Sequence, residues 1–327
     1  MSFKAILLQS QPAFSAQVSD LDEALLPEGD VLVRVAYSSL NYKDALALSN
    51  RGPVVRTWPM VPGIDAAGVV EASSHPRFHA GDAVLVNGWG LGETRWGGLG
   101  QLLRVPGDWL LPIPAPYSAF EAAALGTAGY TAALCVQALT RHGLKPADGP
   151  VLVTGATGGV GSVAVMLLAR MGFQVSAVSG KAAAADYLTG LGAAEVLARD
   201  AFAAPGRPLQ KERFAGVVDT LGSHALANAC AQVRRDGAVA ACGLAMGMDF
   251  PASVAPFILR GVTLYGIDSV YAPAVRRQDA WYLLSCYVGA ADLVAMSHGI
   301  GLAEAIPAAQ RLLAGEVSGR YVVDVNA

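Results

Sequence analysis

Apolar and polar positions follow two different patterns along the chain, and the change falls near Pro150. Before it, short apolar runs are cut by Gly, Pro or Asp about every ten residues, as in Val31–Ala36, Gly81–Val86 and Gln101–Val105. Short runs with turn residues between them predict a β-barrel or β-sandwich. After Pro150, strand-like and helix-like stretches alternate, which predicts an α/β domain with a doubly wound parallel sheet.

The most informative stretch is Val151–Gly161, where three β-prone residues enter a glycine-rich turn. From Val160 to Met171 the apolar positions have the three- and four-residue spacing of an amphipathic helix. A strand, a glycine turn and a helix in this order are typical of a dinucleotide site, because the backbone can approach a pyrophosphate and the helix N-terminus offers free N–H groups. In isolation, the same turn can be a plain strand-to-helix connection.

The second strand of this unit, Gln174–Ser179, predicts which dinucleotide binds. Its end lacks the acidic residue that would bind the ribose 2′-hydroxyl of NAD. Ser179, Gly180 and Lys181 stand there instead, and a hydroxyl, a close-approach glycine and a cation suit a 2′-phosphate. We therefore predict NADPH as the cofactor. A solvated lysine at a helix start is the alternative interpretation of Lys181.

Composition narrows the class of protein. The chain has 327 residues, of which 53% are hydrophobic and 15% charged, which indicates a compact protein of two domains. The net charge of −3 gives no sign of a nucleic-acid surface or a basic membrane patch. The N-terminal segment lacks the pattern of a signal peptide, and the longest apolar stretch, 119–136, is interrupted by Glu121 and by glycines. We expect a cytoplasmic protein without a membrane span.

The end of the chain predicts a return to the first domain. Gly301–Ala314 reads as a helix and Arg320–Val325 as an alternating strand. A complete six-stranded sheet has no place for that last strand. We therefore assign 1–120 and 293–327 to the first domain, and 121–292 to the dinucleotide-binding domain.

Several segments together resemble the medium-chain dehydrogenase/reductase superfamily, and are similar to its zinc-free, quinone-oxidoreductase-like branch. Within that branch they resemble the subgroup of NADPH-dependent acryloyl-CoA reductases. The resemblance implies a GroES-like β-barrel domain plus a Rossmann domain, a CoA thioester substrate and a homodimer. The segments that carry it are Ser38–Ala45, Pro59–Asp65, Gly88–Gly90, Trp96–Gly98, Gly126–Gly129, Ala241–Leu244, Pro256–Arg260 and Gly266–Ser269. Two residues depart from the subgroup: Ala66 stands where an aromatic is usual, and Lys181 where an arginine is usual.

The same resemblance argues against a metal. Zinc-dependent members of the superfamily have a cysteine and a histidine–glutamate pair at positions that here hold Asn41–Asp44 and Ile64–Asp65. The four cysteines are Cys135, Cys230, Cys242 and Cys286, and they are too scattered to form a zinc lobe, a redox motif or an evident disulfide. We expect no metal.

Three residues of the first domain are the catalytic candidates that the resemblance implies. Tyr42 is the first, as a donor to the substrate or a neighbour of the nicotinamide, and a packed aromatic is the alternative interpretation. Asn41 and Asp65 are the other two. Asn41 could instead hold a helix start, and Asp65 could instead form an Asx-type turn.

The resemblance also implies cofactor contacts. Besides Tyr42, it places Thr157, Gly158, Gly159 and Val160 at the pyrophosphate, Ser179, Gly180 and Lys181 at the 2′-phosphate, Arg199 on the adenine side, and Leu244, Ile258 and Ser269 at the nicotinamide. By residue type alone, Leu244 and Ile258 would be core residues and Arg199 a surface cation.

The predicted reaction is hydride transfer from NADPH to an activated double bond. With acryloyl-CoA, the hydride would add to the β-carbon, negative charge would build on the thioester oxygen, and a proton would complete propionyl-CoA at the α-carbon. Two alternatives stay open at this point. One is an NADPH:quinone or general enone oxidoreductase, and the other is a non-catalytic NADPH-binding sensor or structural protein.

Overall fold

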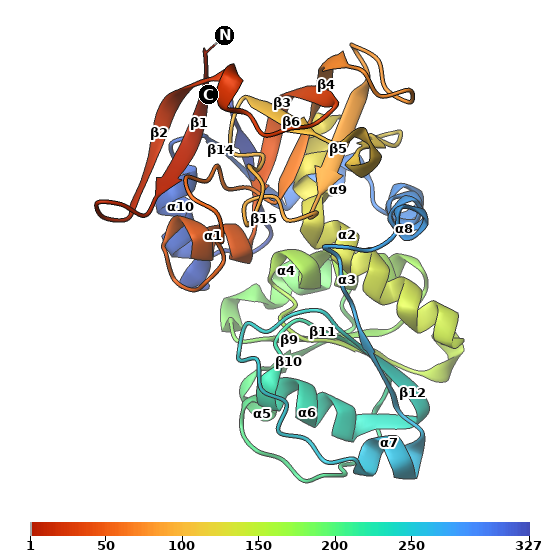
Figure 1. The fold of residues 1–327 in the computed structure, drawn as a ribbon. Helices are drawn as coiled ribbons and strands as arrows, with labels where there is room; N and C mark the ends of the chain where they lie inside the picture. Colours follow the sequence, from red (N-terminus) through yellow and green to blue (C-terminus); the bar gives the residue numbers. More distant parts are fainter. Residues whose placement is uncertain (1) are drawn as a thin grey trace. The chain divides into compact units, whose positions relative to one another are not determined.

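A computed structural model describes residues 2–327 and divides the chain into two compact units (Figure 1). Unit 1 holds the chain up to Thr127 together with Val270–Gln278 and Gly289–Ala327. Unit 2 holds Ala128–Ser269 and Asp279–Val288. The predicted boundaries differ from this division, because residues 121–127, 270–278 and 289–292 belong to unit 1.

Unit 1 is built mainly from β-strands. They are β1 (Ser2–Gln9), β2 (Ser15–Asp22), β3 (Val31–Leu40), β4 (Asp65–Ser73), β5 (Ala83–Asn87), β6 (Leu102–Val105), β7 (Leu111–Pro112), β14 (Ser297–Gly301) and β15 (Arg320–Asp324). Its helices are α1 (Tyr42–Leu48), α9 (Ala290–Ala295) and α10 (Ala305–Leu313), with short 3-10 turns η1 (Glu23–Leu25) and η2 (Gly107–Trp109). The main sheet has the order β14-β15-β3-β4-β5-β7, β6 also pairs with β3, and β1 and β2 form a separate hairpin.

Strand β3 organises this sheet. Val31, Val33 and Val35 are buried, while Arg34 between them is exposed, as the two-residue period of a strand requires. Its first half pairs with β6, and its second half, from Tyr37 to Leu40, pairs antiparallel with β15. The prediction that the last strand returns to the first domain is confirmed. Strand β14, which pairs with β15, was not predicted from the sequence.

Unit 2 contains a parallel sheet in the order β10-β9-β8-β11-β12-β13. Its strands are β8 (Val151–Val153), β9 (Val175–Ser179), β10 (Glu195–Ala198), β11 (Phe214–Asp219), β12 (Val233–Ala241) and β13 (Thr263–Gly266). Its helices are α3 (Gly159–Arg170), α4 (Ala185–Gly190), α5 (Asp200–Ala203), α6 (Ser223–Gln232) and α7 (Ala255–Arg260), with 3-10 turns η3 (Pro146–Asp148) and η4 (Ala182–Ala184). Figure 1 shows α3 and α4 on one face of the sheet and α5, α6 and α7 on the other. This is the predicted doubly wound arrangement, in which all strand carboxyl ends meet at one edge.

Helices α2 (Ala119–His142) and α8 (Ala274–Tyr287) contribute residues to both units. A capping-box contact opens α2, where the Ser118 N–H donates to Glu121 at 2.8 Å. By length and composition alone, α2 is apolar enough to cross a membrane. However, 89% of its apolar window is buried inside the protein, and the helical geometry breaks at Gly126, where φ is 48°. These are the properties of a core helix.

Candidate cofactor site and buried polar cluster

The glycine turn of unit 2 has the form that a pyrophosphate requires. Gly155 has a φ of +60°, and a Cβ on Gly161 would overlap the carbonyl oxygen of Gly155, so both positions favour glycine. Helix α3 begins directly afterwards, and its N-cap is Gly158, which has no side chain to cap the first N–H groups. Thr157 is buried in the turn, and Gly158 is exposed. The first N–H groups of α3 are therefore available to an anionic ligand.

Strands β9 and β10 bring the three residues predicted at the 2′-phosphate together with Arg199, which was predicted on the adenine side. The Ser179 hydroxyl accepts the Lys181 N–H at 3.0 Å. The Arg199 N–H donates to the Ser179 carbonyl oxygen, also at 3.0 Å. A Cβ on Gly180 would lie only 2.7 Å from Cζ of Arg199, so the guanidinium lies directly against this glycine.

The Lys181 and Arg199 cations thus flank one short backbone segment at the carboxyl edge of the sheet. Burial lowers the pKa of Lys181 from its ordinary value, because desolvation disfavours the charged form. A bound phosphate would offset that cost. Two cations and a hydroxyl fit a 2′-phosphate better than they fit a free ribose hydroxyl.

The three residues predicted to lie at the nicotinamide come from three different segments of unit 2. Leu244 follows β12, Ser269 follows β13, and both therefore belong to the carboxyl edge. Leu244 is 53% exposed, so it is not the core residue that its type would suggest.

Ile258 lies on a helix that precedes β13, and its contact with the nicotinamide stays a prediction. It is on α7, and Arg260 of the same helix donates to the carbonyl oxygens of Ala231 and Val233, at the amino end of β12. Ile258 is 73% exposed on this helix, so it is not the core residue that its type would suggest. Its cofactor contact rests on the resemblance alone.

In unit 1, Tyr42 is the first residue of α1 and is 44% exposed. Among residues 2–327, no hydrogen bond to its hydroxyl is formed, so the group can donate to a ligand. Asn41, the residue before it, is 8% exposed and is the N-cap of the helix. The two adjacent candidates therefore differ: Tyr42 faces solvent, whereas Asn41 belongs to a buried cluster.

Asp65 is the centre of that cluster. Its carboxylate accepts from Ser39 Oγ at 2.5 Å, Asn41 Nδ2 at 2.8 Å and Asn87 Nδ2 at 2.7 Å. It also accepts the backbone N–H of Thr127 at 2.9 Å. The side chain is 1% exposed, so its oxygens are occupied by the protein and shielded from solvent. This geometry fits a positioning residue.

Arg320 supplies the positive charge of the cluster. Its guanidinium donates to Asn41 Oδ1 at 3.1 Å and to Ser39 Oγ at 2.8 Å, and it lies 3.9 Å from the Asp65 carboxylate. Burial lowers the pKa of Arg320, while the Asp65 and Asp44 carboxylates favour its charged form. The sequence analysis placed Arg320 in the last strand but gave it no role. The sequence feature that could have indicated a role for Arg320 is its position, as a charged residue at the start of an apolar strand.

Asp44 ties the cluster to α1. It accepts the Asn41 N–H at 2.9 Å and the Ile64 N–H at 3.0 Å. Burial, followed by repulsion from Asp65, raises the pKa of Asp44 to about 7. Two carboxylates thus share one buried guanidinium, and the one farther from it takes up a proton near neutral pH.

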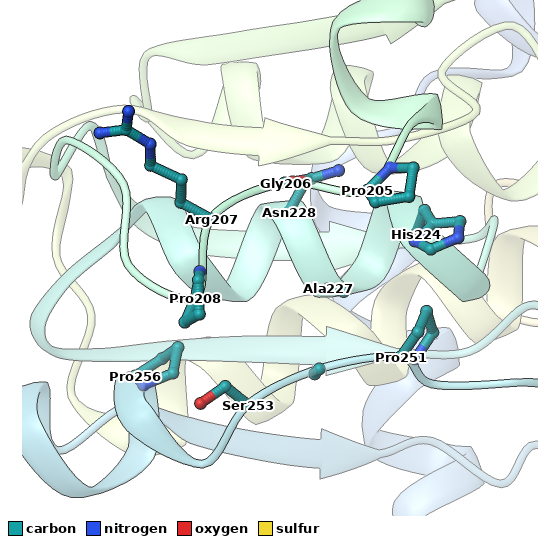
Figure 2. Close-up of a pocket in the computed structure, with 11 residues that line it drawn as sticks. Pro205, Gly206, Arg207, Pro208, His224, Ala227, Asn228, Pro251, Ser253 and Pro256 are labelled. Carbon is teal, nitrogen blue, oxygen red and sulfur yellow. The ribbon is translucent and has the colours of Figure 1, made fainter.

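Outside these two sites, unit 2 has a cavity of about 250 Å³. Figure 2 shows the residues that line it. Its lining includes four prolines together with Arg207, His224, Asn228 and Ser253. None of the predicted site residues lines it. Within residues 2–327, no three His, Cys, Asp or Glu side chains cluster so that they could hold a metal ion.

Comparison with known proteins gives two family matches. Residues 27–115 match the alcohol dehydrogenase GroES-like domain, and residues 159–284 match the zinc-binding dehydrogenase family. The chain is 50% identical to the probable acrylyl-CoA reductase AcuI of Escherichia coli K12, over 99% of this chain and 100% of that relative. It is 48% identical to the acrylyl-CoA reductase AcuI of Ruegeria pomeroyi, over 95% of each chain.

Solved structures are similar over the whole chain. The yhdH oxidoreductase of Salmonella enterica, in complex with NADP, has a TM-score of 0.97 at 50% identity, covering 98% of this chain and 99% of that one. The Bacillus subtilis protein yhfP, with NAD bound, has a TM-score of 0.95 at 42% identity, covering 99% and 100%.

A GroES-like domain joined to a Rossmann domain with a dinucleotide turn defines a class of two-domain oxidoreductases. The chain belongs to the medium-chain dehydrogenase/reductase superfamily, in its quinone-oxidoreductase-like branch. The resemblance inferred from the sequence and the predicted architecture are both confirmed.

The buried cluster predicts a pH dependence of stability. Because the pKa of Asp44 is about 7 in the folded protein and an aspartate in an unfolded chain titrates near about 4, the folded state favours the protonated carboxyl. The contribution of Asp44 to the stability of the folded protein is complete below about pH 4 and is lost as the pH rises through about 7. The free energy of unfolding should fall over this range by up to about 1.4 kcal/mol per pH unit from this group.

Urea unfolding of the wild type and of Asp44→Asn, measured at several pH values, tests this. The variant should be less stable overall, because the amide cannot accept every hydrogen bond of the carboxylate, but its dependence on pH should be flatter. Asp20→Asn, an exposed control, should retain the wild-type slope. An unchanged slope in Asp44→Asn would contradict the assignment.

Proposed function

We propose that the protein reduces the carbon–carbon double bond of acryloyl-CoA to form propionyl-CoA, with NADPH as the hydride donor. The observation that carries the substrate is the similarity to two relatives named acrylyl-CoA reductase, at 50% and 48% identity over nearly the full chain. The observation that supports the cofactor is the pair of cations, Lys181 and Arg199, beside Gly180.

Unit 2 would hold the cofactor through three parts of its carboxyl edge. The N–H groups that begin α3, from Gly159 and Val160, would meet the pyrophosphate, and Thr157 and Gly158 would form the turn around it. Ser179, Gly180, Lys181 and Arg199 would surround the 2′-phosphate. Leu244 and Ser269 would lie toward the nicotinamide. Bound NADPH supplies a hydride.

Unit 1 would stabilise the charge that forms on the substrate. Addition of hydride to the β-carbon moves an electron pair toward the thioester oxygen, and a proton must then reach the α-carbon. A tyrosine hydroxyl is protonated at neutral pH and can donate to an oxyanion. The exposed Tyr42, whose hydroxyl meets no acceptor within residues 2–327, is our candidate for this donor.

Asn41 and Asp65 would act through Tyr42 rather than on the substrate. Every polar atom of the Asn41 side chain is used by Ser39, Asp44, Asp65 or Arg320. A rigid N-cap sets the position of the first helical residue. We therefore propose a positioning role for Asn41 and Asp65.

We also propose a cytoplasmic homodimer. Within the described part of the chain, β13 pairs with β12 alone and forms an edge of the sheet. The neighbouring α7 exposes Ile258 (73%) and Leu259 (56%). An open strand edge beside apolar surface supports an interface between copies. Sedimentation equilibrium that returned the mass of one chain would refute the dimer.

Turnover with several acceptors tests the substrate assignment. NADPH oxidation should be fastest with acryloyl-CoA, slower with crotonyl-CoA, whose extra methyl group crowds the β-carbon, and slowest with a benzoquinone. Absorbance of NADPH gives the kcat/KM for each acceptor. Fastest turnover on the quinone would favour the quinone oxidoreductase alternative. Tight NADPH binding without turnover on any acceptor would favour the non-catalytic alternative.

Binding of the two reduced cofactors tests the 2′-phosphate assignment. Lys181→Ala and Arg199→Ala should each weaken NADPH binding about tenfold or more, because each removes a charge-assisted contact. The Kd for NADH should stay nearly constant, since NADH lacks the phosphate. Fluorescence titration measures both constants, and Arg207→Ala, a change at an exposed loop cation, is the matched control. If the variants weakened the binding of NADPH and of NADH equally, the 2′-phosphate assignment would be wrong.

A further inference from the structure

The proposed substrate poses an electrostatic problem for this chain. Coenzyme A carries a 3′-phosphate and a pyrophosphate, with about four negative charges at neutral pH. The protein has a net charge of −3. The overall field therefore opposes association, and binding requires a local group of cations.

Two loops of unit 1 meet beside the first turn of α1. Lys43, the residue after Tyr42, places Nζ 2.7 Å from Oε1 of Glu93. The backbone N–H of Arg56 donates to the carbonyl oxygen of the same glutamate at 2.8 Å. Glu93 therefore joins the loop that carries Arg56, the loop that carries Arg95 and the helix that begins with Tyr42.

Arg95 is held on an aromatic surface. Its carbonyl oxygen accepts the Gly92 N–H at 2.7 Å, which closes the turn. Its Cζ lies 5.8 Å from the centroid of the Trp109 ring, and Trp109 stacks on Trp89 with centroids 5.7 Å apart. A guanidinium above an indole keeps the N–H donors at its edge available to a second ligand.

The charges around Glu93 do not balance. Lys43 is neutralised by Glu93, whereas Arg51, Arg56 and Arg95 are all exposed and form no ion pair within residues 2–327. The Arg51 backbone N–H donates to Leu46 near the end of α1, at 2.9 Å, which anchors this residue to the same helix. We name Arg51, Arg56 and Arg95 the basic rim. It gives an acidic chain a group of exposed, unpaired positive charges on loops that contact α1 at Lys43 and Leu46.

Resting on the proposed acryloyl-CoA activity, we propose that the basic rim binds the phosphates of the CoA moiety, with Arg56 and Arg95 as the principal contacts. Guanidinium groups bind phosphate oxygens in a bidentate manner, which gives orientation as well as attraction. The rim would thus hold the nucleotide end of the substrate while the acryloyl end lies at Tyr42. It would determine the preference for a CoA thioester over a simple enone.

A pair of substrates that differ only in the phosphates tests this. Acryloyl-N-acetylcysteamine has the same acryloyl thioester but no phosphate. In the double variant Arg56→Ala with Arg95→Ala, the KM for acryloyl-CoA should rise about tenfold or more, with kcat unchanged. The KM for the small thioester should not change. Arg235→Ala, at an exposed position in the first part of β12, is the matched control and should leave both KM values unchanged.

Direct binding gives a second readout. Calorimetric titration of the NADP⁺-loaded protein with CoA should show about tenfold weaker binding in the double variant. High salt should weaken CoA binding to the wild type more than to the variant, because screening acts on the lost contacts. Dephospho-CoA, which lacks the 3′-phosphate, shows which of the two phosphate groups the rim contacts.

The outcomes separate this inference from the proposed function. Turnover of acryloyl-CoA by the wild type, with the same KM and CoA affinity in the double variant, would overturn the basic rim and leave the reductase assignment standing. A wild type that turns over neither acryloyl thioester would overturn the reductase assignment. In that case the CoA titration still tests whether the basic rim binds CoA. An equal affinity for CoA in the wild type and the double variant would overturn that proposal.

Discussion

The buried pairing of Arg320 with Asp65 is the interaction on which the candidate catalytic surface of unit 1 depends. The two residues begin β15 and β4, which lie on either side of β3, and they are 4% and 1% exposed. Removing either one would leave an uncompensated buried charge, at a cost of about 3–5 kcal/mol. Because Asn41 bonds to both, the contacts that join the three strands also fix where α1 begins.

In this arrangement, the residues that fix the start of α1 are different from the residue proposed to donate to the substrate. The carboxylates of Asp44 and Asp65 are occupied by hydrogen bonds inside the protein, so they are poorly placed to exchange protons with a substrate. Tyr42 extends outward from the first turn of the helix that they hold. The same helix carries Lys43, which contacts the loops of the basic rim through Glu93. One rigid helix start therefore serves both the proposed donor to the oxyanion and the proposed substrate anchor.

Much of the fold follows from local sequence patterns. The period of the apolar positions predicted the parallel sheet, and the glycine spacing predicted the turn at Gly155–Gly161, because both depend on neighbours in the chain. The cluster of Ser179, Gly180 and Lys181 was predicted for the same reason. Arg320 could not be assigned to Asp65, since that contact depends on strand pairing across most of the chain. The cofactor contact of Ile258 rests on the resemblance and stays a prediction.

The central claim is that the buried cluster presents Tyr42 to the substrate as a donor, and the kcat of Tyr42→Phe tests it most directly. The variant should retain the wild-type melting temperature and NADPH affinity, while kcat with acryloyl-CoA falls about 10²- to 10³-fold, the usual cost of removing one donor to an oxyanion. Tyr282→Phe, at a tyrosine that is 71% exposed, should retain full activity. An unchanged kcat in Tyr42→Phe would contradict the account.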